Sequence, residues 1–504
     1  MGMFELLGLG VQVVFTPMNL LFIFIGIVLG VIFGALPGVS AAMAVALMVP
    51  FTFTLDPVGS IAFLSATYCA AITGGGIPAI LFKIPGTPSS AVTTFDGYPL
   101  AQRGQAGKAL LLVLLASAFG GIVSAFAMLL VSRQLSEIGL KFGPSELFAV
   151  AFLGLSVLTS LDEDKMLKTI ISGLTGLLLA TMSMDPVDGV PRLTFGSSYM
   201  LGGIPMIPVM VGMFAISEVL KQVGRPQDKD DRPEMVDLKK SPMRLSWKEW
   251  WSLKWTLLRC SVVGTIVGIL PGAGATIASF LGYGMEIKLS KHPEEFGKGS
   301  LHGLAAAETS NNAATGGSMV PLLSLGIPGG NAAAVMVAAL MLQGVQVGPI
   351  LLKAQPAYLS GTFVAMIVTN IMMVFIAIFV AKAFAQLMKI PYYFLGPLIC
   401  LFAAVGSFAA QNNSTDILVT MLAGVAGYFM MEFKYSPAAL TLGLVLGDIC
   451  ENNLRRAVMI TRGDYWAVFS RPITAGLLVV CAFLLVLPTL KKFKKKPAQT
   501  DAGK

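Results

Sequence analysis

Long apolar runs separated by short polar segments dominate the chain. Residues 6–55 contain no Asp, Glu, Lys, Arg or His, and neither do residues 309–352. Further uncharged runs cover residues 57–82, 109–131, 193–217, 260–285, 354–381, 390–415 and 473–490. A bilayer core needs about 20 apolar residues per helix, and most of these runs are that long. The pattern predicts an all-α polytopic membrane protein with about 10–12 transmembrane helices, some of them re-entrant or broken.

The composition agrees with this pattern. Only 12% of the 504 residues are charged and the mean hydropathy is +0.78, whereas soluble domains carry about 25% charged residues. The net charge of +8 comes from loops and a tail rather than from a basic groove, so we expect no nucleic-acid partner. The partner implied by the composition is the lipid bilayer.

Charge also predicts the topology. Five lysines between residues 491 and 496 follow an apolar run, which predicts a basic cytoplasmic tail over residues 491–504. Residues 221–255 hold nine Lys or Arg against six Asp or Glu and are predicted to form a cytoplasmic linker. This linker holds four of the five tryptophans, at positions 247, 250, 251 and 255. Their spacing on one helical face favours an interfacial helix lying on the membrane, with a solvated linker as the alternative.

Three motifs recur in the same order in the two parts of the chain. Gly34-Ala-Leu-Pro-Gly38 returns as Gly268-Ile-Leu-Pro-Gly272, and Thr73-Gly-Gly75 returns as Thr315-Gly-Gly317. Ile84-Pro-Gly86 returns as Ile327-Pro-Gly329, each with a proline six residues before its isoleucine. The recurrence predicts two homologous membrane repeats, at residues 1–220 and 256–490. The second repeat follows a basic loop and the first does not, which favours an inverted repeat over a parallel one.

The Pro-Gly pairs lie deep inside uncharged runs, where they break helices. They are Pro37 with Gly38, Pro85 with Gly86, Pro271 with Gly272 and Pro328 with Gly329. Paired breaks in two repeats are the best sequence pointer to the binding site of a transporter, because the start of a half-helix favours an anion. Packing kinks are the alternative. The predicted substrate site comprises Lys83, Pro85, Gly86, Thr87, Ser89, Ser90, Pro328, Gly329, Gly330 and Asn331.

Lys83 is the one basic residue next to these breaks. It can neutralise a substrate carboxylate, or it can extend to the membrane interface from a helix end. A second polar segment runs from Glu308 into the Thr-Gly-Gly motif and offers the oxygen ligands that suit a cation. We expect Na⁺ rather than H⁺ to bind there, to Glu308, Thr309, Ser310, Asn311, Asn312 and Thr315. The alternatives are proton coupling through Glu308 and hydrogen bonds that tie two helices together.

Other candidate chemistry is sparse. The charged segment from Asp448 to Arg456 is predicted to form a structural ion-pair cluster. Two histidines and five scattered cysteines give no metal-ligand spacing, so no metal site and no cofactor other than the coupling cation are expected. The sequence also lacks a nucleotide-binding or nucleophile motif, and we therefore expect no enzyme activity and no transport driven directly by ATP.

At these motifs the chain resembles the large membrane subunit of the tripartite tricarboxylate transporters, the TctA family. The resemblance is carried by both Leu-Pro-Gly segments, by residues 73–86 and 95–100, by residues 308–330, and by residues 451–456 with Arg471 and Pro472. It implies a bacterial inner-membrane subunit that works with a small four-helix membrane subunit and a periplasmic solute-binding protein. It also implies uptake of a di- or tricarboxylate driven by an ion gradient. A TRAP-type or stand-alone organic-anion transporter is the rival within transport, and a membrane-embedded enzyme or scaffold is the rival from another class.

Overall fold

The computed structural model describes residues 3–36, 39–139, 141–160, 166–185, 189–223, 241–270, 274–387 and 392–494. Within these ranges the chain is helical, with no β-strand beyond one isolated bridge between Met184 and Pro191. The all-α prediction is confirmed. The helix breaks predicted at Pro37, Gly38, Pro271 and Gly272 lie outside the described residues, as do residues 224–240 of the linker and residues 495–504 of the basic tail.

Several helices are suited to cross a bilayer. Among the described residues, six helical segments are long and apolar enough: Pro17–Ala35, Pro57–Phe82, Thr93–Glu137, Met206–Val223, Pro356–Ala383 and Ser414–Glu432. Shorter apolar helices accompany them, among them Ala41–Thr54, Asn331–Leu342 and Pro472–Leu485. The chain is thus a multi-pass membrane protein, while the total of about 10–12 crossings stays a prediction.

Contacts divide the chain into two compact units. One comprises residues 1–140 and 205–429, and the other residues 141–204 and 430–504. Each unit combines segments from both predicted repeats. The units therefore differ from the predicted division at residues 220 and 256, which rests on motif recurrence and stays a prediction.

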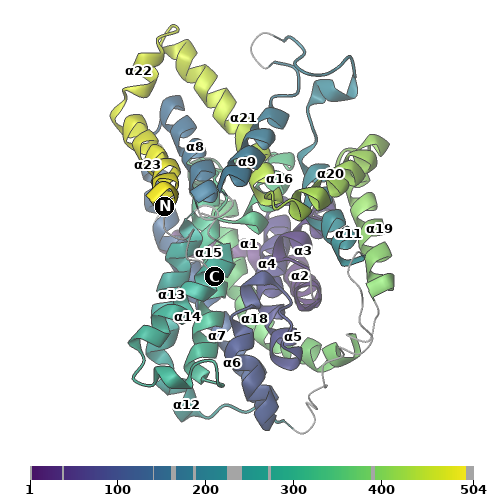
Figure 1. Cartoon of the computed structure of the whole chain (residues 1–504), viewed down its shortest axis with the longest axis vertical. Coiled ribbons are helices and arrows are strands. Elements are labelled where there is room, and N and C mark those ends of the chain that lie inside the picture. Colours follow the sequence, from purple (N-terminus) through teal and green to yellow (C-terminus); the bar gives the residue numbers. More distant parts are fainter. Residues whose placement is uncertain are drawn as a thin grey trace, which may run out of the picture. The chain divides into compact units, whose positions relative to one another are not determined.

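The first unit contains most of the helices, shown in Figure 1. In chain order they are α1 (Met3–Val14), α2 (Pro17–Ala35), α3 (Ala41–Met48), α4 (Pro57–Gly74), α5 (Gly76–Phe82), α6 (Thr93–Leu100), α7 (Ala106–Gly139), α10 (Met206–Val211), α11 (Ser217–Val223), α12 (Trp247–Ser252), α13 (Lys254–Ile269), α14 (Gly274–Leu289), α15 (Leu301–Leu325), α16 (Asn331–Leu342), α17 (Leu351–Ala354), α18 (Pro356–Leu387), α19 (Tyr392–Gln411) and α20 (Ser414–Glu432). Helix α15 packs against α7, α13 and α14, and α2 packs against α4.

Glycines let the backbones of two helix pairs touch. A Cβ atom on Gly30 of α2 would lie 2.6 Å from the carbonyl oxygen of Thr67 on α4. A Cβ atom on Gly268 of α13 would lie 2.5 Å from the carbonyl oxygen of Ala314 on α15. Small residues at helix interfaces permit this approach in membranes. The helix that leads into each Leu-Pro-Gly segment is therefore packed in the same way.

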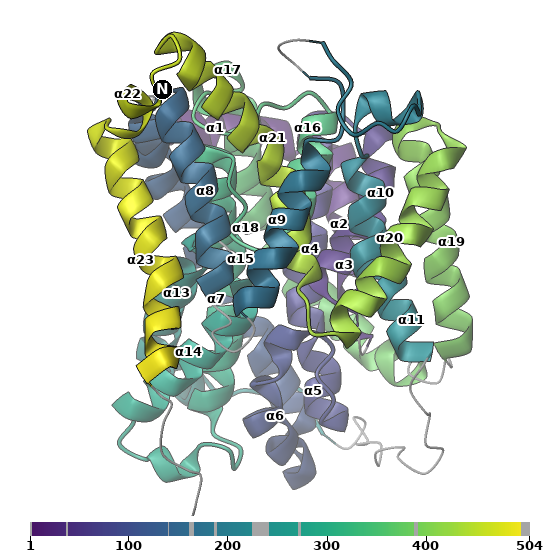
Figure 2. The same ribbon diagram turned by 45° about the horizontal axis from the view of Figure 1, so that its top comes forward.

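The second unit contains α8 (Pro144–Ser160), α9 (Met166–Ala180), α21 (Pro437–Ile460), α22 (Tyr465–Phe469) and α23 (Pro472–Lys494), visible in Figure 2. Helix α21 packs against α8 and α9, and α23 packs against α8. Glu451 pairs with Arg192 and, at 2.8 Å, with Arg455, which also lies 2.9 Å from Asp185. These pairs confirm the ion-pair cluster predicted from residues 448–456.

The tryptophans of the linker divide between two helices. Ser246 caps α12 through a capping box with Glu249, and α13 begins at Lys254, so Trp255 belongs to the second helix. Trp247, Trp251 and Trp255 are exposed, whereas Trp250 packs against the hydrophobic core. Three of the four tryptophans are thus available to a membrane surface, and the interfacial location stays a prediction.

Candidate functional site

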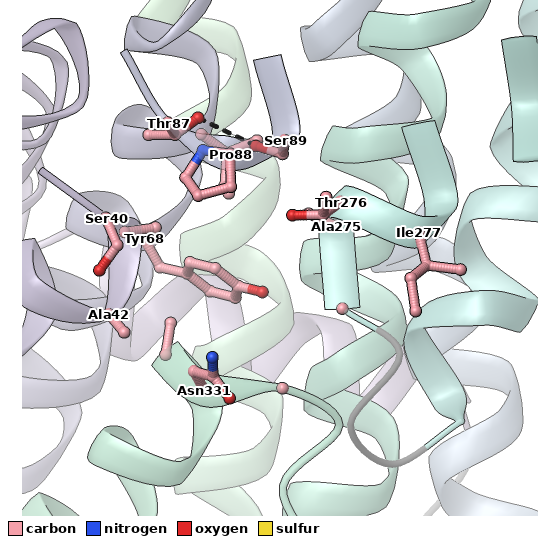
Figure 3. Close-up of a pocket in the computed structure, with 15 residues that line it drawn as sticks. Ser40, Ala42, Tyr68, Thr87, Pro88, Ser89, Ala275, Thr276, Ile277 and Asn331 are labelled. Atoms are coloured by element: carbon pink, nitrogen blue, oxygen red, sulfur yellow. Dashed lines mark hydrogen bonds between the residues drawn. The ribbon is translucent and has the colours of Figure 1, made fainter. Parts of the chain in front are cut away.

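A cavity of about 300 Å³ lies within the first unit, lined by residues that follow all four predicted breaks. Four segments contribute: Ser40–Ala42, Thr87–Ser89, Gly274–Ile277 and Gly330–Ala332, together with Tyr68 and Ile72 of α4. Figure 3 shows Ser89 and Asn331 on opposite sides of Tyr68, with Thr276 across from them. The volume is at the lower end of the range for small-molecule sites. The cavity therefore suits a small ligand.

Three helices begin at this cavity. The lining residues include the first turns of α3, α14 and α16. The first amides of a helix lack an intrahelical acceptor, and each helix start carries about half a positive charge. Thr87, by contrast, precedes only a short 3₁₀ turn at Pro88–Ser90. The arrangement favours an anion.

The polar side chains of the cavity are small and uncharged. Ser40, Tyr68, Thr87, Ser89, Thr276 and Asn331 supply hydroxyl and amide groups, and none of the described lining residues is ionisable at neutral pH. The hydroxyls of Thr87 and Ser89 lie 3.0 Å apart. A ligand in this cavity would meet hydrogen-bond donors and helix dipoles rather than a permanent cation.

The predicted substrate residues divide into two groups. Thr87, Ser89, Gly330 and Asn331 line the cavity, whereas Pro85, Gly86, Ser90, Pro328, Gly329 and Lys83 are not among its lining residues. Ser90 is buried behind the cavity wall, with its hydroxyl 3.0 Å from that of Thr87.

Lys83 lies at the exposed end of α5, in a left-handed conformation with φ of 58°. Its ammonium group lies 5.8 Å from the centre of the Tyr98 ring. The charge is therefore held by an aromatic face outside the cavity.

Backbone contacts bring the breaks together. A Cβ atom on Gly86 would collide with the carbonyl oxygen of Gly34, and one on Gly329 would collide with that of Gly268. In addition, the Gly86 amide donates to the carbonyl oxygen of Gly75 at 3.1 Å. Each Ile-Pro-Gly segment thus lies directly on the helix that carries the Leu-Pro-Gly segment of the same half. Only glycine fits such a contact without displacing the backbone.

The second candidate site centres on Glu308 of α15, whose side chain is fully buried. Its carboxylate accepts hydrogen bonds from Thr93 of α6, from Ser117 of α7 at 3.0 Å and from the Asn311 amide at 3.4 Å. No Lys, Arg or His forms an ion pair with it among the residues that the structure describes. A buried carboxylate without a basic partner is costly, and a bound cation or a proton relieves that cost.

Three residues that follow Glu308 on α15 carry buried oxygen atoms without a hydrogen-bond partner among the described residues. These atoms are Thr309 Oγ1, Asn311 Oδ1 and Asn312 Oδ1. Glu308, Asn311, Asn312 and Thr315 share one face of α15, since they are spaced three or four residues apart. The oxygen-rich cluster expected from the sequence is therefore present on one helix face.

Two of the six predicted ion-site residues lie on other faces. The backbone of Thr309 touches Gly120 of α7, and the Ser310 side chain touches Gly282 of α14. The Ser310 hydroxyl donates to the carbonyl oxygen of Ala306 at 2.6 Å. Ser310 thus packs helices rather than joining the cluster, and Thr309 lies between α15 and α7.

Comparison with known proteins matches the chain to the Tripartite tricarboxylate transporter TctA family over residues 20–442. The chain belongs to the TctA family. An uncharacterised 52.8 kDa protein from Agrobacterium vitis, encoded in the TAR-I ttuC' 3' region, is 38% identical over 499 residues, covering 98% of this chain and 99% of that protein. A second protein of that organism, from the TAR-II ttuC' 3' region, is 39% identical over 231 residues, which are 45% of this chain and 96% of that protein. No solved structure gives a significant match.

Sequence reasoning missed several residues of both sites in this TctA-family chain. Ser40 and Thr276 follow the two Leu-Pro-Gly segments and line the cavity, so the repeated motif itself was the available signal. Thr93 and Ser117 donate to Glu308 from helices that are distant in sequence. Nothing in the local pattern marks them, because only the packing of α6 and α7 against α15 brings them there.

Proposed function

We propose that this TctA-family chain is the large membrane subunit of a binding-protein-dependent secondary transporter that imports a small di- or tricarboxylate. One observation carries the proposal: segments that follow all four predicted breaks line a single cavity. Irregular backbone at membrane depth persists where it lines a cavity or is buried in protein. Paired breaks that meet at one cavity are typical of a transport site.

The substrate is held by donors without a formal charge. Its carboxylates accept hydrogen bonds from Ser89, Asn331 and the first amides of α14 and α16, and three helix starts add partial positive charge. An uncharged site also releases its ligand readily, because no buried ion pair has to be broken. Lys83 acts from outside the cavity as a counter-charge during entry.

A cation gradient drives uptake, with Na⁺ favoured over H⁺. The support is the buried carboxylate of Glu308, followed on the same helix face by Asn311 and Asn312, whose Oδ1 atoms have no hydrogen-bond partner within the described ranges. Hard oxygen ligands suit such a cation. Thr315 lies on the same helix face, and its hydroxyl hydrogen is used in a bond to the Asn312 carbonyl oxygen at 2.7 Å, so its oxygen is left to act as a ligand.

The two halves of the chain are inverted repeats, and the C-terminus is cytoplasmic in the bacterial inner membrane. The support is the recurrence of three motifs, the matching glycine contacts of α2 with α4 and of α13 with α15, and the basic tail. Movement of one part of the cavity wall relative to the other then opens the site to alternate sides of the membrane.

The family name implies a tripartite system, which a small four-helix membrane subunit and a periplasmic solute-binding protein complete. The test is uptake of labelled mono-, di- and tricarboxylates by cells carrying this chain with both candidate partners, beside cells that lack each one. Uptake that needs all three proteins supports the proposal. Uptake by this chain alone indicates a stand-alone transporter, and absence of uptake for every acid contradicts a transport role.

A further inference from the structure

A line of buried polar residues on α4 and α15 joins the Glu308 cluster to the cavity, connected by hydrogen bonds and, at Cys69 and Thr315, through the residue itself, because the side chain and the carbonyl oxygen of each have different partners. The Asn312 amide donates to the Thr73 hydroxyl, which donates to the carbonyl oxygen of Cys69 at 3.2 Å. The Cys69 thiol lies 3.4 Å from the Thr315 hydroxyl. The line passes between α4 and α15 and is buried along its whole length.

The line ends at Tyr68. The Ser318 hydroxyl donates to the Thr315 carbonyl oxygen at 2.8 Å, and the Tyr68 hydroxyl lies 3.4 Å from the Ser318 oxygen. Tyr68 also lines the cavity, where Figure 3 shows its ring reaching toward α14. One hydroxyl therefore belongs to both the line and the cavity.

The hydrogens along the line have a definite direction. Ser318 has one hydroxyl hydrogen, which is used on the Thr315 carbonyl, so Tyr68 must donate to Ser318. The Tyr68 oxygen then faces the cavity as an acceptor. A carboxylate needs a donor at this place, and binding is stronger if the Tyr68 hydrogen turns away from Ser318 toward the ligand.

The far end of the line contains oxygens that a cation would engage. Asn312 Oδ1 has no hydrogen-bond partner in the part of the chain that the structure describes, while the amide nitrogen of the same side chain donates to Thr73. A cation bound to that oxygen would fix the side chain whose amide holds the Thr73 hydroxyl of α4. The residues of the line are all buried, and burial makes an unpaired polar group costly.

We infer that the Thr73–Cys69–Thr315–Ser318–Tyr68 line links cation binding at the Glu308 cluster to carboxylate binding in the cavity. Tyr68 and Ser318 are positioning residues at the cavity end. The inference rests on the proposed function. Because linkage is reciprocal, a cation that favours the donor orientation of Tyr68 is itself bound more tightly when the carboxylate is present.

The test uses the full-length chain in lipid nanodiscs and needs no knowledge of the substrate. A Thr276→Cys variant places a thiol in the cavity wall, and its labelling by a polar maleimide is timed in NaCl and in choline chloride. The chain without this substitution measures the background from the native cysteines. We expect Na⁺ to change the labelling rate by about 5-fold or more, the range of ordinary coupling energies.

Tyr68→Phe and Ser318→Ala each remove one hydroxyl of the line. When either substitution is combined with Thr276→Cys, we expect the ratio of the labelling rates in NaCl and in choline chloride to fall to near one. Na⁺ should still raise the melting temperature of both variants. Ser324→Ala is the matched control, since the hydroxyl of this buried serine donates within α15, to the carbonyl oxygen of Val320, and this variant should keep the full ratio.

Three results would overturn the inference. The first is an unchanged effect of Na⁺ on the labelling rate in Tyr68→Phe and Ser318→Ala. The second is a labelling rate of the Thr276→Cys parent that is the same with and without Na⁺. The third is loss of thermal stabilisation by Na⁺ in both variants, which would place them in the cation site itself. Failure of the proposed function is distinguished by uptake, which would then be absent for every carboxylate tested.

Discussion

The side-chain amide of Asn312 on α15 donates a hydrogen bond to the hydroxyl of Thr73 on α4, joining residues 239 positions apart. Thr73 opens the Thr-Gly-Gly motif of the first half, and Asn312 lies three residues before the same motif in the second half. The two motif copies therefore meet in space. Both groups are buried, so breaking the contact would leave the Asn312 amide without this acceptor, a cost of about 1–3 kcal/mol, while the Thr73 hydroxyl would still donate to the carbonyl oxygen of Cys69.

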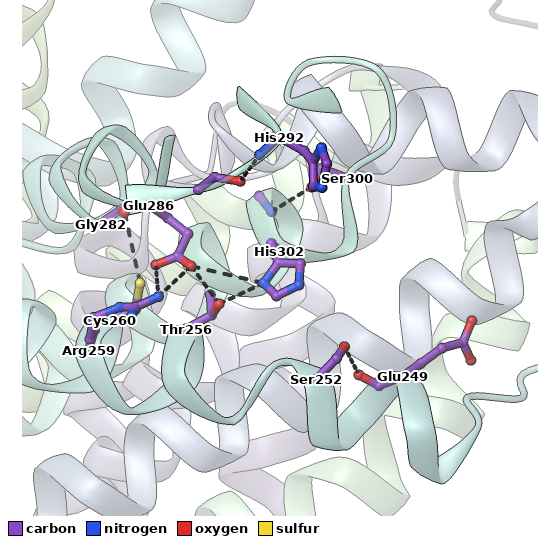
Figure 4. Close-up of polar contacts among 12 residues, drawn as sticks. Glu249, Ser252, Thr256, Arg259, Cys260, Gly282, Glu286, His292, Ser300 and His302 are labelled. Atoms are coloured by element: carbon purple, nitrogen blue, oxygen red, sulfur yellow. Dashed lines mark hydrogen bonds and ion pairs between the residues drawn. The ribbon is translucent and has the colours of Figure 1, made fainter. Parts of the chain in front are cut away.

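Bulky residues at Ser89 or Asn331 should abolish uptake. Both side chains face the cavity, and Ser89→Trp or Asn331→Trp would fill much of its volume of about 300 Å³. We expect loss of uptake by about 100-fold or more, with normal amounts of protein in the membrane fraction. Ser252→Trp is the control, because Ser252 is exposed on α12, where Figure 4 shows its hydroxyl bonded to Glu249. Normal transport by both cavity variants would place the substrate site elsewhere and leave the Pro-Gly pairs as packing kinks.

Neutralising Lys83 should weaken uptake of a tricarboxylate more than that of a monocarboxylate. The ammonium group lies outside the cavity, beside Tyr98, so its attraction acts over distance and grows with the charge of the ligand. For Lys83→Gln we expect a several-fold rise in KM for the tricarboxylate, a smaller rise for the monocarboxylate, and less difference at high salt. Equal effects on both acids would assign Lys83 a structural role.

Replacing Na⁺ by choline at constant pH should stop uptake. Glu308→Gln should remove the dependence on Na⁺, because it deletes the charge that the buried oxygen cluster offers a cation, while keeping the size of the side chain. The measurement is initial uptake rate against Na⁺ concentration for both proteins. Uptake that is indifferent to Na⁺ in the parent would rule out sodium coupling and make proton coupling through Glu308 the leading choice.

Two glycines of the second half should respond oppositely to alanine. Gly268→Ala would place a Cβ atom 2.5 Å from the Ala314 carbonyl oxygen, and overpacking of this kind costs about 1–3 kcal/mol. Gly284→Ala has no neighbouring atom within 4 Å and should stabilise its helix by about 0.5–1 kcal/mol. Thermal unfolding in detergent should give a lower Tm for the first variant and an unchanged or higher Tm for the second. An unchanged Tm for Gly268→Ala would show that the α13–α15 contact tolerates separation.

The ion pair at the linker should make stability depend on pH in acid. Lys108 donates to Glu249 at 2.7 Å and lowers the pKa of that carboxyl from its ordinary 4.5 to about 2. The ionised form is thus favoured in the folded state, and its stabilisation is complete above pH 4.5 and is lost as the pH falls toward 2. Tm should therefore fall less over this range in Glu249→Gln than in the parent chain. Parallel curves would show that the pair contributes nothing measurable, as exposed pairs often do.

The sequence was sufficient for the helical membrane class, because uncharged runs of helix-spanning length leave few alternatives. It also singled out Ser89 and Asn331, which line the cavity, since a break motif that occurs twice marks the residues just after it; their role in binding stays a prediction. It could not place Lys83, whose direction depends on a left-handed turn at that residue. Nor could it find Tyr68, Thr93 or Ser117, which become functional neighbours only through the packing of α4, α6 and α7 against α15.

Helix α15 has a consequence for how the chain is made. It is 25 residues long, yet it is not among the six helices apolar enough to cross a membrane by composition. Its buried stripe of Glu308, Asn311, Asn312 and Thr315 would be poorly tolerated by lipid alone. The partners of that stripe come from α4, α6 and α7 of the first half, which leave the ribosome earlier. We therefore expect α15 to be retained in the bilayer only after those helices are in place, so that biogenesis of the second half depends on completion of the first.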